Sequence, residues 1–226
     1  MLKMMCGIEL EFQRKDIKKV NLRIRKDGSI LLTAPMRVPI EKAEAFVYEN
    51  LGWIEEHRTK VLKAYERRQH RYDIGSTVHI LGHPFLIRSD DGAEHFVIDT
   101  ESSCVICPRN CTSADTERFM SASYRRILTD VLSESIPRWE ETMGLRCSGW
   151  SVRSMETKWG TCNIRTGRIC FSINLGPKMI EDIDYVIVHE LAHLLVDNHG
   201  PDFKRLVSAY IPNWKVRKER LNSGVF

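Results

Sequence analysis

Two histidines four residues apart lie in a short apolar stretch near the carboxyl end of the 226-residue chain. His189 and His193 flank Glu190 within the segment Val188-His189-Glu190-Leu191-Ala192-His193-Leu194. On a helix, this spacing turns the second imidazole by about 40° and lifts it by one turn, so both rings can reach one metal ion. The pattern therefore predicts a zinc site in which Glu190 activates a zinc-bound water without being a ligand.

The residues around this motif predict a buried helix. Between Tyr185 and Val196, the only titratable side chains besides Tyr185 are His189, Glu190 and His193. A helix that is apolar nearly all round lies in a core, and polar groups there must be satisfied by hydrogen bonds or by a metal. A hydrogen-bonded cluster without a metal requires no particular spacing. A metal site requires this one, so we favour the metal.

A catalytic zinc usually has three protein ligands and one open position. The best candidate for the third ligand is His199, because Asp197-Asn198 and Gly200-Pro201 can end the helix between it and His193. Asp202 and Glu219 stay open as alternatives, since a carboxylate third ligand is also common.

The elements that position these residues begin with a β-rich first half. Residues 17–34 alternate apolar and polar side chains on both sides of Asp27-Gly28, which predicts a hairpin. Helical spacing follows over about residues 40–68. Turn residues then separate four short strand candidates, at 78–80, 85–87, 96–98 and 105–106.

The second half should be built around the metal helix. Residues 113–136 have the pattern of a long helix that is extended or kinked at Pro137. The best strand pattern lies at 168–175, and the metal helix should run from Pro177 to about Asp197. No internal repeat is visible by inspection.

These patterns predict an α+β fold with a β-rich domain at 1–112 and a metal-dependent domain at 113–226. Hydrophobic residues make up 42% of the chain and charged residues 28%, as in an ordinary globular protein. No apolar run approaches the length of a membrane span, and residues 1–7 are too short for a signal peptide, so we expect a cytoplasmic protein with no membrane partner. The net charge of +4 leaves a nucleic-acid partner open.

Seven scattered cysteines argue against a disulfide framework. Cys104, Cys107 and Cys111 are close enough in sequence to hold a second metal. With no fourth ligand nearby they make an incomplete site, and reduced thiols are the simpler interpretation.

Beyond the zinc motif, the chain carries Trp159-Gly160-Thr161-Cys162 ahead of a strand, Asn198-His199 with Phe203 after the helix, and Trp53-Ile54 and Leu81-Gly82-His83 in the first half. With these residues the sequence resembles the YgjP-like zinc metallopeptidase family, a relative of the SprT and WLM minimal zincins. The resemblance implies a zincin-like second half, with His189, His193 and His199 as zinc ligands and Glu190 as the catalytic base. Thr161 replaces the serine that is usual in the family and keeps its hydroxyl.

Three functions fit these residues. In the first, a metallopeptidase, a peptide or protein substrate pairs with an exposed edge of the 168–175 strand. In the second, a pyrophosphatase, the same metal and base hydrolyse a nucleoside triphosphate held by nearby basic residues, namely Arg153, Lys158, Arg165 and Arg168. The third is a non-catalytic binding module with a structural zinc, which we rank last because such sites favour four ligands and cysteine.

Overall fold

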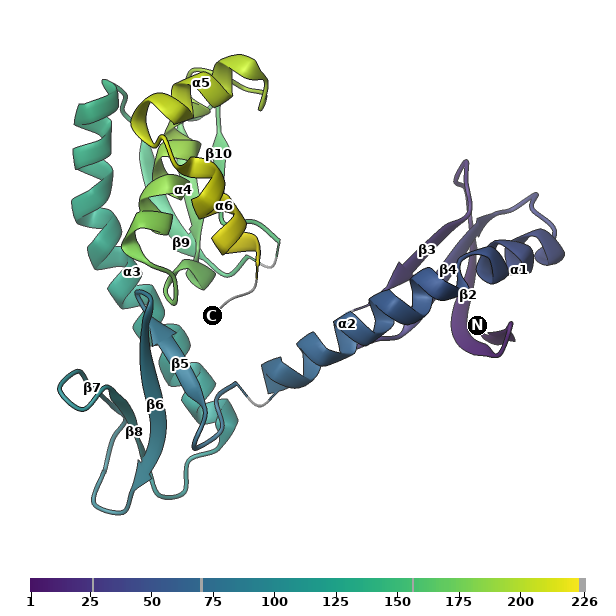
Figure 1. Cartoon of the computed structure of the whole chain (residues 1–226), viewed down its shortest axis with the longest axis horizontal. Coiled ribbons are helices and arrows are strands. Elements are labelled where there is room, and N and C mark those ends of the chain that lie inside the picture. The colour runs from purple at the N-terminus through teal and green to yellow at the C-terminus, as the bar shows by residue number, and fades with distance from the viewer. Residues whose placement is uncertain (26, 70, 156, 224–226) are drawn as a thin grey trace. The chain divides into compact units, whose positions relative to one another are not determined.

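The computed structural model describes residues 1–25, 27–69, 71–155 and 157–223 (Figure 1). Its sheets and helices confirm the predicted α+β class. The chain divides into two compact units, Met1–Arg71 and Tyr72–Phe226. The boundary expected at 112/113 falls inside the second unit, because the sheet before this point and the helix after it share one hydrophobic core.

The first unit is a four-stranded sheet with two helices. The strand order is β1-β2-β4-β3, with β2 and β4 parallel and each outer strand antiparallel to its neighbour. The predicted hairpin is present as β3 and β4, and Gly28 in its turn has φ 80°. The predicted helical region is also present, whereas β1 and β2 were not predicted. The bounds are β1 Leu2–Met5, β2 Ile8–Lys15, β3 Asn21–Ile24, β4 Ile30–Pro35, α1 Ile40–Glu49 and α2 Leu51–Gln69.

The second unit begins with another four-stranded sheet, which contains all four predicted short strands. Its order is β5-β6-β8-β7, and the apolar face packs on Met120 and Tyr124 of the following helix. The Tyr124 hydroxyl donates a hydrogen bond of 2.8 Å to the carbonyl oxygen of His79. The bounds are β5 Thr77–Ile80, β6 His83–Asp90, β7 Val97–Asp99 and β8 Cys104–Pro108.

The two four-stranded sheets have the same topology, an internal repeat that inspection of the sequence did not find. In each sheet, the first two strands form an antiparallel hairpin. The fourth strand pairs parallel with the second, and the short third strand pairs antiparallel with the fourth. Both hairpins turn through two residues of positive φ, Cys6-Gly7 and Leu81-Gly82. The equivalent parallel pairs even end alike, with Lys15 opposite Pro35 and Asp90 opposite Pro108.

Helix α3 (Ser113–Met143) joins two hydrophobic cores. The Thr112 side chain caps its first turn, and Gly144 ends it with φ 64°. Pro137 lies inside the helix, so the helix predicted for 113–136 continues past this residue. Its amino-terminal half packs on the β5–β8 sheet, and Leu128, Leu132 and Ile136 of its other half enter the core around the metal motif.

A three-stranded sheet lies behind the metal motif, with strands β9 (Gly149–Arg153), β10 (Gly160–Asn163) and β11 (Arg168–Ser172). β11 is shorter than the strand predicted at 168–175, because a 3-10 turn, η1 (Ile173–Leu175), takes up its last three residues. The order is β10-β11-β9. The expectation that this strand offers an exposed edge is wrong, because β9 and β10 occupy both of its edges and are the outer strands of the sheet.

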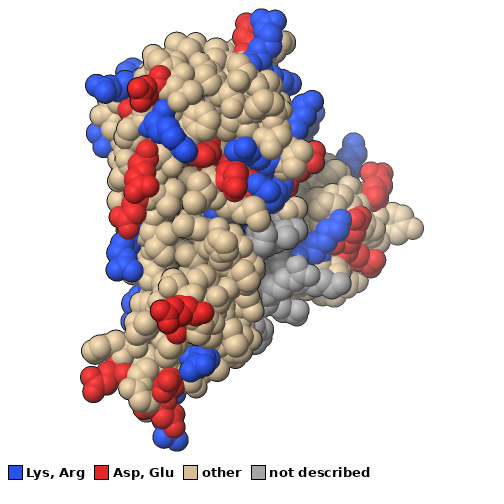
Figure 2. Space-filling model, turned by 60° about the vertical axis from the view of Figure 1, so that its left-hand side comes forward, with Lys and Arg blue, Asp and Glu red and all other residues tan. Residues whose placement is uncertain are grey.

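Three helices complete the second unit: α4 (Ile180–Ala192), α5 (Pro201–Tyr210) and α6 (Trp214–Asn222). The metal helix is shorter than expected at both ends, and α5 and α6 were not predicted. On the face of the second unit that Figure 2 shows, Lys and Arg are interspersed with Asp and Glu. Among the described residues, no helix is both long and apolar enough to cross a membrane.

Candidate metal centre

Helix α4 carries the metal motif through the middle of the largest core. Its first turn contains Glu181 and Asp182, which suit the positive end of the helix dipole. Nine of its side chains are buried, and the helix ends where His193 takes the C-cap position. The predicted burial of the helix is confirmed. Of the polar side chains of the motif, Glu190 is buried, whereas His189 and His193 are half-buried.

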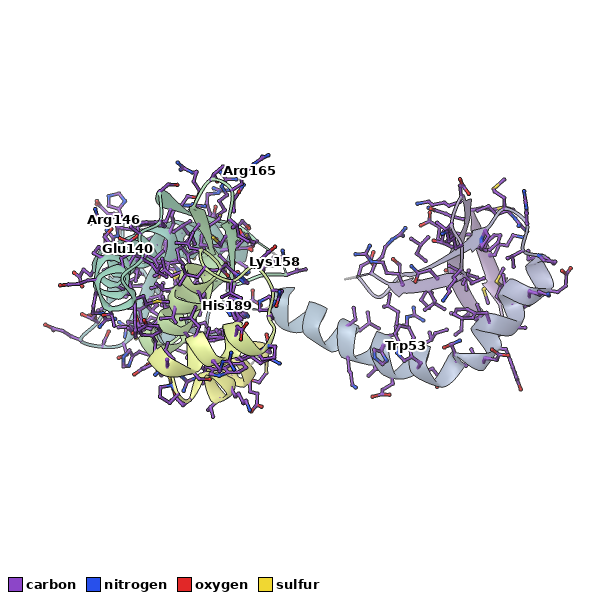
Figure 3. The ribbon with its side chains drawn as sticks, turned by 90° about the horizontal axis from the view of Figure 1, so that it is seen from above. Trp53, Glu140, Arg146, Lys158, Arg165 and His189 are labelled. Atoms are coloured by element: carbon purple, nitrogen blue, oxygen red, sulfur yellow. The ribbon has the colours of Figure 1, made fainter. Side chains whose placement is uncertain are left out.

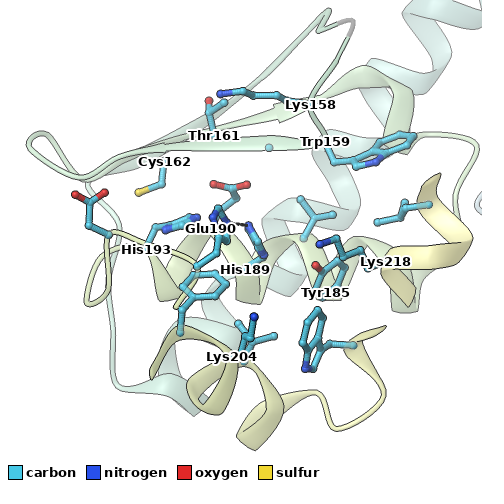
Figure 4. Close-up of a pocket in the computed structure, with 18 of the residues that line it drawn as sticks. Lys158, Trp159, Thr161, Cys162, Tyr185, His189, Glu190, His193, Lys204 and Lys218 are labelled. Carbon is cyan, nitrogen blue, oxygen red and sulfur yellow. Dashed lines mark hydrogen bonds between the residues drawn. The ribbon is translucent and has the colours of Figure 1, made fainter. Parts of the chain in front are cut away.

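The imidazoles of His189, His193 and His199 converge on one point. Figure 4 shows the first two beside Glu190. The ligand atoms of the three histidines all lie within 4.8 Å of one another, and the Nε2 atoms of His189 and His199 are 3.1 Å apart. Two ligands about 2.1 Å from a tetrahedral zinc are separated by roughly 3.3 Å. The three side chains therefore fit a single ion of this size.

The loop after α4 brings His199 to this point. The N–H groups of Leu195 and Val196 donate hydrogen bonds to the carbonyl oxygen of Ala192. Gly200 is the N-cap residue of α5, and its N–H donates a hydrogen bond of 2.9 Å to Asn198 Oδ1. Of the alternatives considered for a third ligand, Asp202 forms an ion pair with Arg205 on its own helix. Neither Asp202 nor Glu219 belongs to the convergent group that the described residues form.

Neighbouring groups fix the orientation and charge of the imidazoles. His193 Nδ1 lies 3.1 Å from the carbonyl oxygen of Val196, so a proton on Nδ1 leaves Nε2 free to bind a metal. The ring of Phe203 packs against all three imidazoles, at centroid distances of 4.6–4.9 Å. Burial, reinforced by the other two imidazoles, lowers the pKa of His189 to about 3. His189 is therefore neutral, as a metal ligand must be.

Glu190 lies against β10, with only 4% of its surface exposed. Burial raises the pKa of Glu190 to about 8, and the Lys158 ammonium acts in the opposite direction. A methyl group on Gly160 would lie 2.6 Å from Glu190 Oε1. The glycine of the Trp159-Gly160-Thr161-Cys162 segment is thus explained by the space that the carboxylate occupies.

An open cavity of about 670 Å³ surrounds the histidines. Of the four basic residues that the sequence placed near a nucleotide, Lys158 alone lines it, while Arg165 lies in the turn between β10 and β11 (Figure 3). Sequence analysis missed Lys204 and Lys218, which line the cavity from α5 and α6. The signal for them was weak because these two helices were not predicted. Other lining side chains are largely apolar, namely Trp159, Tyr185, Val186, Phe203, Val207, Trp214 and Leu221.

A buried ion pair attaches α6 to the metal helix. The Asp182 side chain is fully buried and accepts hydrogen bonds of 2.5 and 2.8 Å from the Arg220 guanidinium. On the cavity side of α6, the ring of Trp214 stacks at 6.4 Å on that of Tyr185. The Nε1 of Trp159 lies 3.5 Å from Asn222 Oδ1. These contacts make α6 one wall of the cavity.

Among the described residues, the side chains of Cys104, Cys107 and Cys111 do not form a convergent group of three metal ligands. Cys107 and Cys111 both approach the hydroxyl of Thr116, at 3.9 Å. Burial raises the pKa of the Cys107 thiol to about 11, so the thiol is protonated near neutral pH.

The buried helix, the convergent imidazoles and the adjoining carboxylate in an open cavity define a metallopeptidase-like hydrolase. The sequence model of the family described as "YgjP-like, metallopeptidase domain" matches residues 18–224, and the chain belongs to this family. The resemblance found in the sequence is thereby confirmed, and with it a metal-dependent peptidase in general.

The crystal structure of the metallopeptidase zymogen of Pyrococcus abyssi abylysin is 19% identical, with a TM-score of 0.39, over 42% of this chain and 94% of that chain. The search of curated proteins gave no match.

The attachment of α6 can be tested with Arg220→Ala. This change leaves the Asp182 carboxylate buried without its partner, and we expect a loss of about 3–5 kcal/mol in the free energy of unfolding. Urea unfolding measures the loss. Arg205→Ala is the matched control, because Arg205 and Asp202 are 78% and 72% exposed and such pairs contribute about 0–1 kcal/mol. Equal losses in the two variants would contradict the role of the buried pair.

Proposed function

We propose that this protein is a zinc-dependent metallopeptidase, in which His189, His193 and His199 hold the zinc and Glu190 is the catalytic base. The observation that carries the proposal is the convergence of three imidazoles beside a buried carboxylate, at the side of a cavity large enough for part of a peptide. The family supports a metal-dependent peptidase; the choice of zinc and the roles of the individual residues are our proposal.

The donor set favours zinc over harder cations. Three neutral imidazoles suit zinc, whereas magnesium and calcium prefer oxygen ligands. A structural zinc would need a fourth protein ligand, and the described residues provide three histidines in a group open to the cavity. When bound, zinc supplies Lewis acidity that polarises a carbonyl group and lowers the pKa of water.

The chain's own residues provide the proton transfers. Glu190 is held against β10, where its carboxylate can take the proton of the attacking water and then deliver it to the amine that leaves. A divalent cation beside Glu190 favours the ionised carboxylate over the neutral form that burial favours. The carboxylate is then a base near neutral pH.

The free edge of β10 offers a place for the substrate backbone. β10 is an outer strand of its sheet and contacts the metal helix. An extended peptide can pair with the N–H and C=O groups on the outer edge of β10. The scissile bond would then lie beside the three histidines. This replaces the 168–175 edge that the sequence suggested.

The proposed ligands predict metal content. His199→Ala should reduce zinc from about one ion per chain to a small fraction, because two imidazoles remain. Asp202→Asn is the control and should keep full occupancy, since Asp202 lies outside the convergent group. Elemental analysis of the purified full chain checks both. Retention of zinc in His199→Ala with its loss in Asp202→Asn would assign the third ligand to the carboxylate.

The proposed base predicts a separation of chemistry from metal binding. Glu190→Gln keeps the size of the side chain but cannot accept a proton, so turnover of an unstructured protein should fall by about a hundredfold or more. Zinc content and melting temperature should change little. The same samples are assayed with nucleoside triphosphates. A nucleotide activity that depends on Glu190, with no peptide cleavage, would replace the peptidase by the phosphoanhydride alternative.

The contact between Glu190 and β10 predicts the effect of Gly160→Ala. The added methyl group must displace the Glu190 carboxylate, so we expect turnover to fall by about tenfold or more while zinc stays bound, because misplacement of a reacting group by about 1 Å can cost a hundredfold. Gly52→Ala, whose methyl group would meet nothing within 4 Å, is the control for a glycine change alone. Unchanged peptidase kinetics in Gly160→Ala would show that the carboxylate is not held there during catalysis.

A further inference from the structure

Three lysines from three different elements surround the metal cavity. Lys158 precedes β10, Lys204 lies on α5 and Lys218 lies on α6. All three side chains are exposed, and none forms a salt bridge with a described residue. Figure 4 shows them on separate sides of the histidine group. These ammonium groups are therefore available to a bound molecule.

The positive rim is not a consequence of overall composition. The second unit has 18 Lys and Arg against 20 Asp and Glu, so its net charge is slightly negative. Two carboxylates line the cavity, those of Glu190 and Asp197. Glu190 lies beside the three histidines, and Asp197 lies on the loop after α4. Among the described residues that line the cavity, a substrate would therefore meet three lysines and one carboxylate, that of Asp197.

The arrangement fits separate carboxylates better than one polyphosphate. Phosphate sites gather their donors around one group, typically backbone N–H groups at a glycine-rich turn with arginine forks or a lysine that acts as a point charge. Among the described residues that line this cavity there is no arginine, and the three lysines stand on different walls. Between them lie the aromatic surfaces of Trp159, Tyr185 and Trp214. Apolar side chains of an extended peptide fit this surface, with acidic side chains beside them at the lysines.

We propose that the preferred substrates are peptide segments with acidic side chains next to an apolar residue at the cleaved bond, selected by Lys158, Lys204 and Lys218. This proposal rests on the peptidase function and assigns its substrate class. Carboxylates that flank the bond pair with the lysines, and an exposed pair of this kind changes binding by about two- to fivefold. Three pairs together give a preference of about tenfold or more over the neutral amides.

The test measures binding separately from cleavage. The zinc-loaded Glu190→Gln full chain is titrated with labelled decapeptides that share an apolar centre and differ only in flanking Glu, Gln or Lys residues. Fluorescence anisotropy should give the tightest binding for the Glu peptide and the weakest for the Lys peptide, with a preference that shrinks in high salt. Equal dissociation constants for the Glu and Gln peptides overturn the proposal.

Charge reversals assign the preference to the rim. Lys204→Glu and Lys218→Glu should each reduce the preference for the Glu peptide by about two- to fivefold, and the triple change with Lys158→Glu should reverse it. Arg165→Glu is the matched control, because it changes the net charge equally from the exposed turn between β10 and β11 and should leave the preference unchanged. An equal effect of Arg165→Glu overturns the proposal in favour of long-range attraction.

Cleavage by the wild-type enzyme distinguishes this inference from the proposed function. Equal kcat/KM for the Glu and Gln peptides leaves the peptidase intact and overturns the acidic specificity. Hydrolysis of nucleoside triphosphates without cleavage of any peptide overturns both. A higher kcat/KM for the Glu peptide that the rim reversals abolish supports both.

Discussion

Helix α4 and its C-cap carry four polar groups to a core otherwise built from aliphatic and aromatic side chains, namely the buried Asp182 and Glu190 and the half-buried His189 and His193. Each group loses part of its hydration there, and different elements accommodate them. Arg220 of α6 pairs with Asp182, the β10 backbone at Gly160 leaves room for Glu190, and the loop to α5 supplies His199 beside His189. These contacts also fix where α6, β10 and the loop to α5 lie relative to the three histidines and Glu190.

The two short helices after the motif illustrate this dependence. α5 and α6 have ten and nine residues, and isolated helices of this length are marginal in water. Phe203 and Val207 anchor α5 in the core, and Leu221 with the Asp182–Arg220 pair anchors α6. Because their inner faces are fixed, their outer residues Lys204 and Lys218 stand at defined positions on the rim of the cavity.

The sequence predicted the site better than its surroundings. The spacing of His189 and His193 and the break before His199 are local properties, so the convergence of the three imidazoles followed from them. The pairing partners of β11 depend on residues far away in the chain, which is why an alternating pattern could not reveal that this strand is central. The repeat of the four-stranded sheet was hidden for a similar reason. This topology requires little more than strands of alternating apolar and polar residues and a two-residue turn that ends in glycine. The other residues differ between the two sheets.

Helix α3 crosses from the core of the β5–β8 sheet to the core of the metal helix without interruption, Pro137 included. Backbone hydrogen bonds along a helix propagate order, so fraying of one half removes support from the other. The second unit should consequently behave as one cooperative folding unit in hydrogen exchange, with amides near Met120 and Leu132 exchanging through the same global opening. The β5–β8 sheet contributes no side chain to the three-histidine group, yet it unfolds together with that group. A destabilising substitution inside this sheet would therefore lower the fraction of folded protein that can bind a metal.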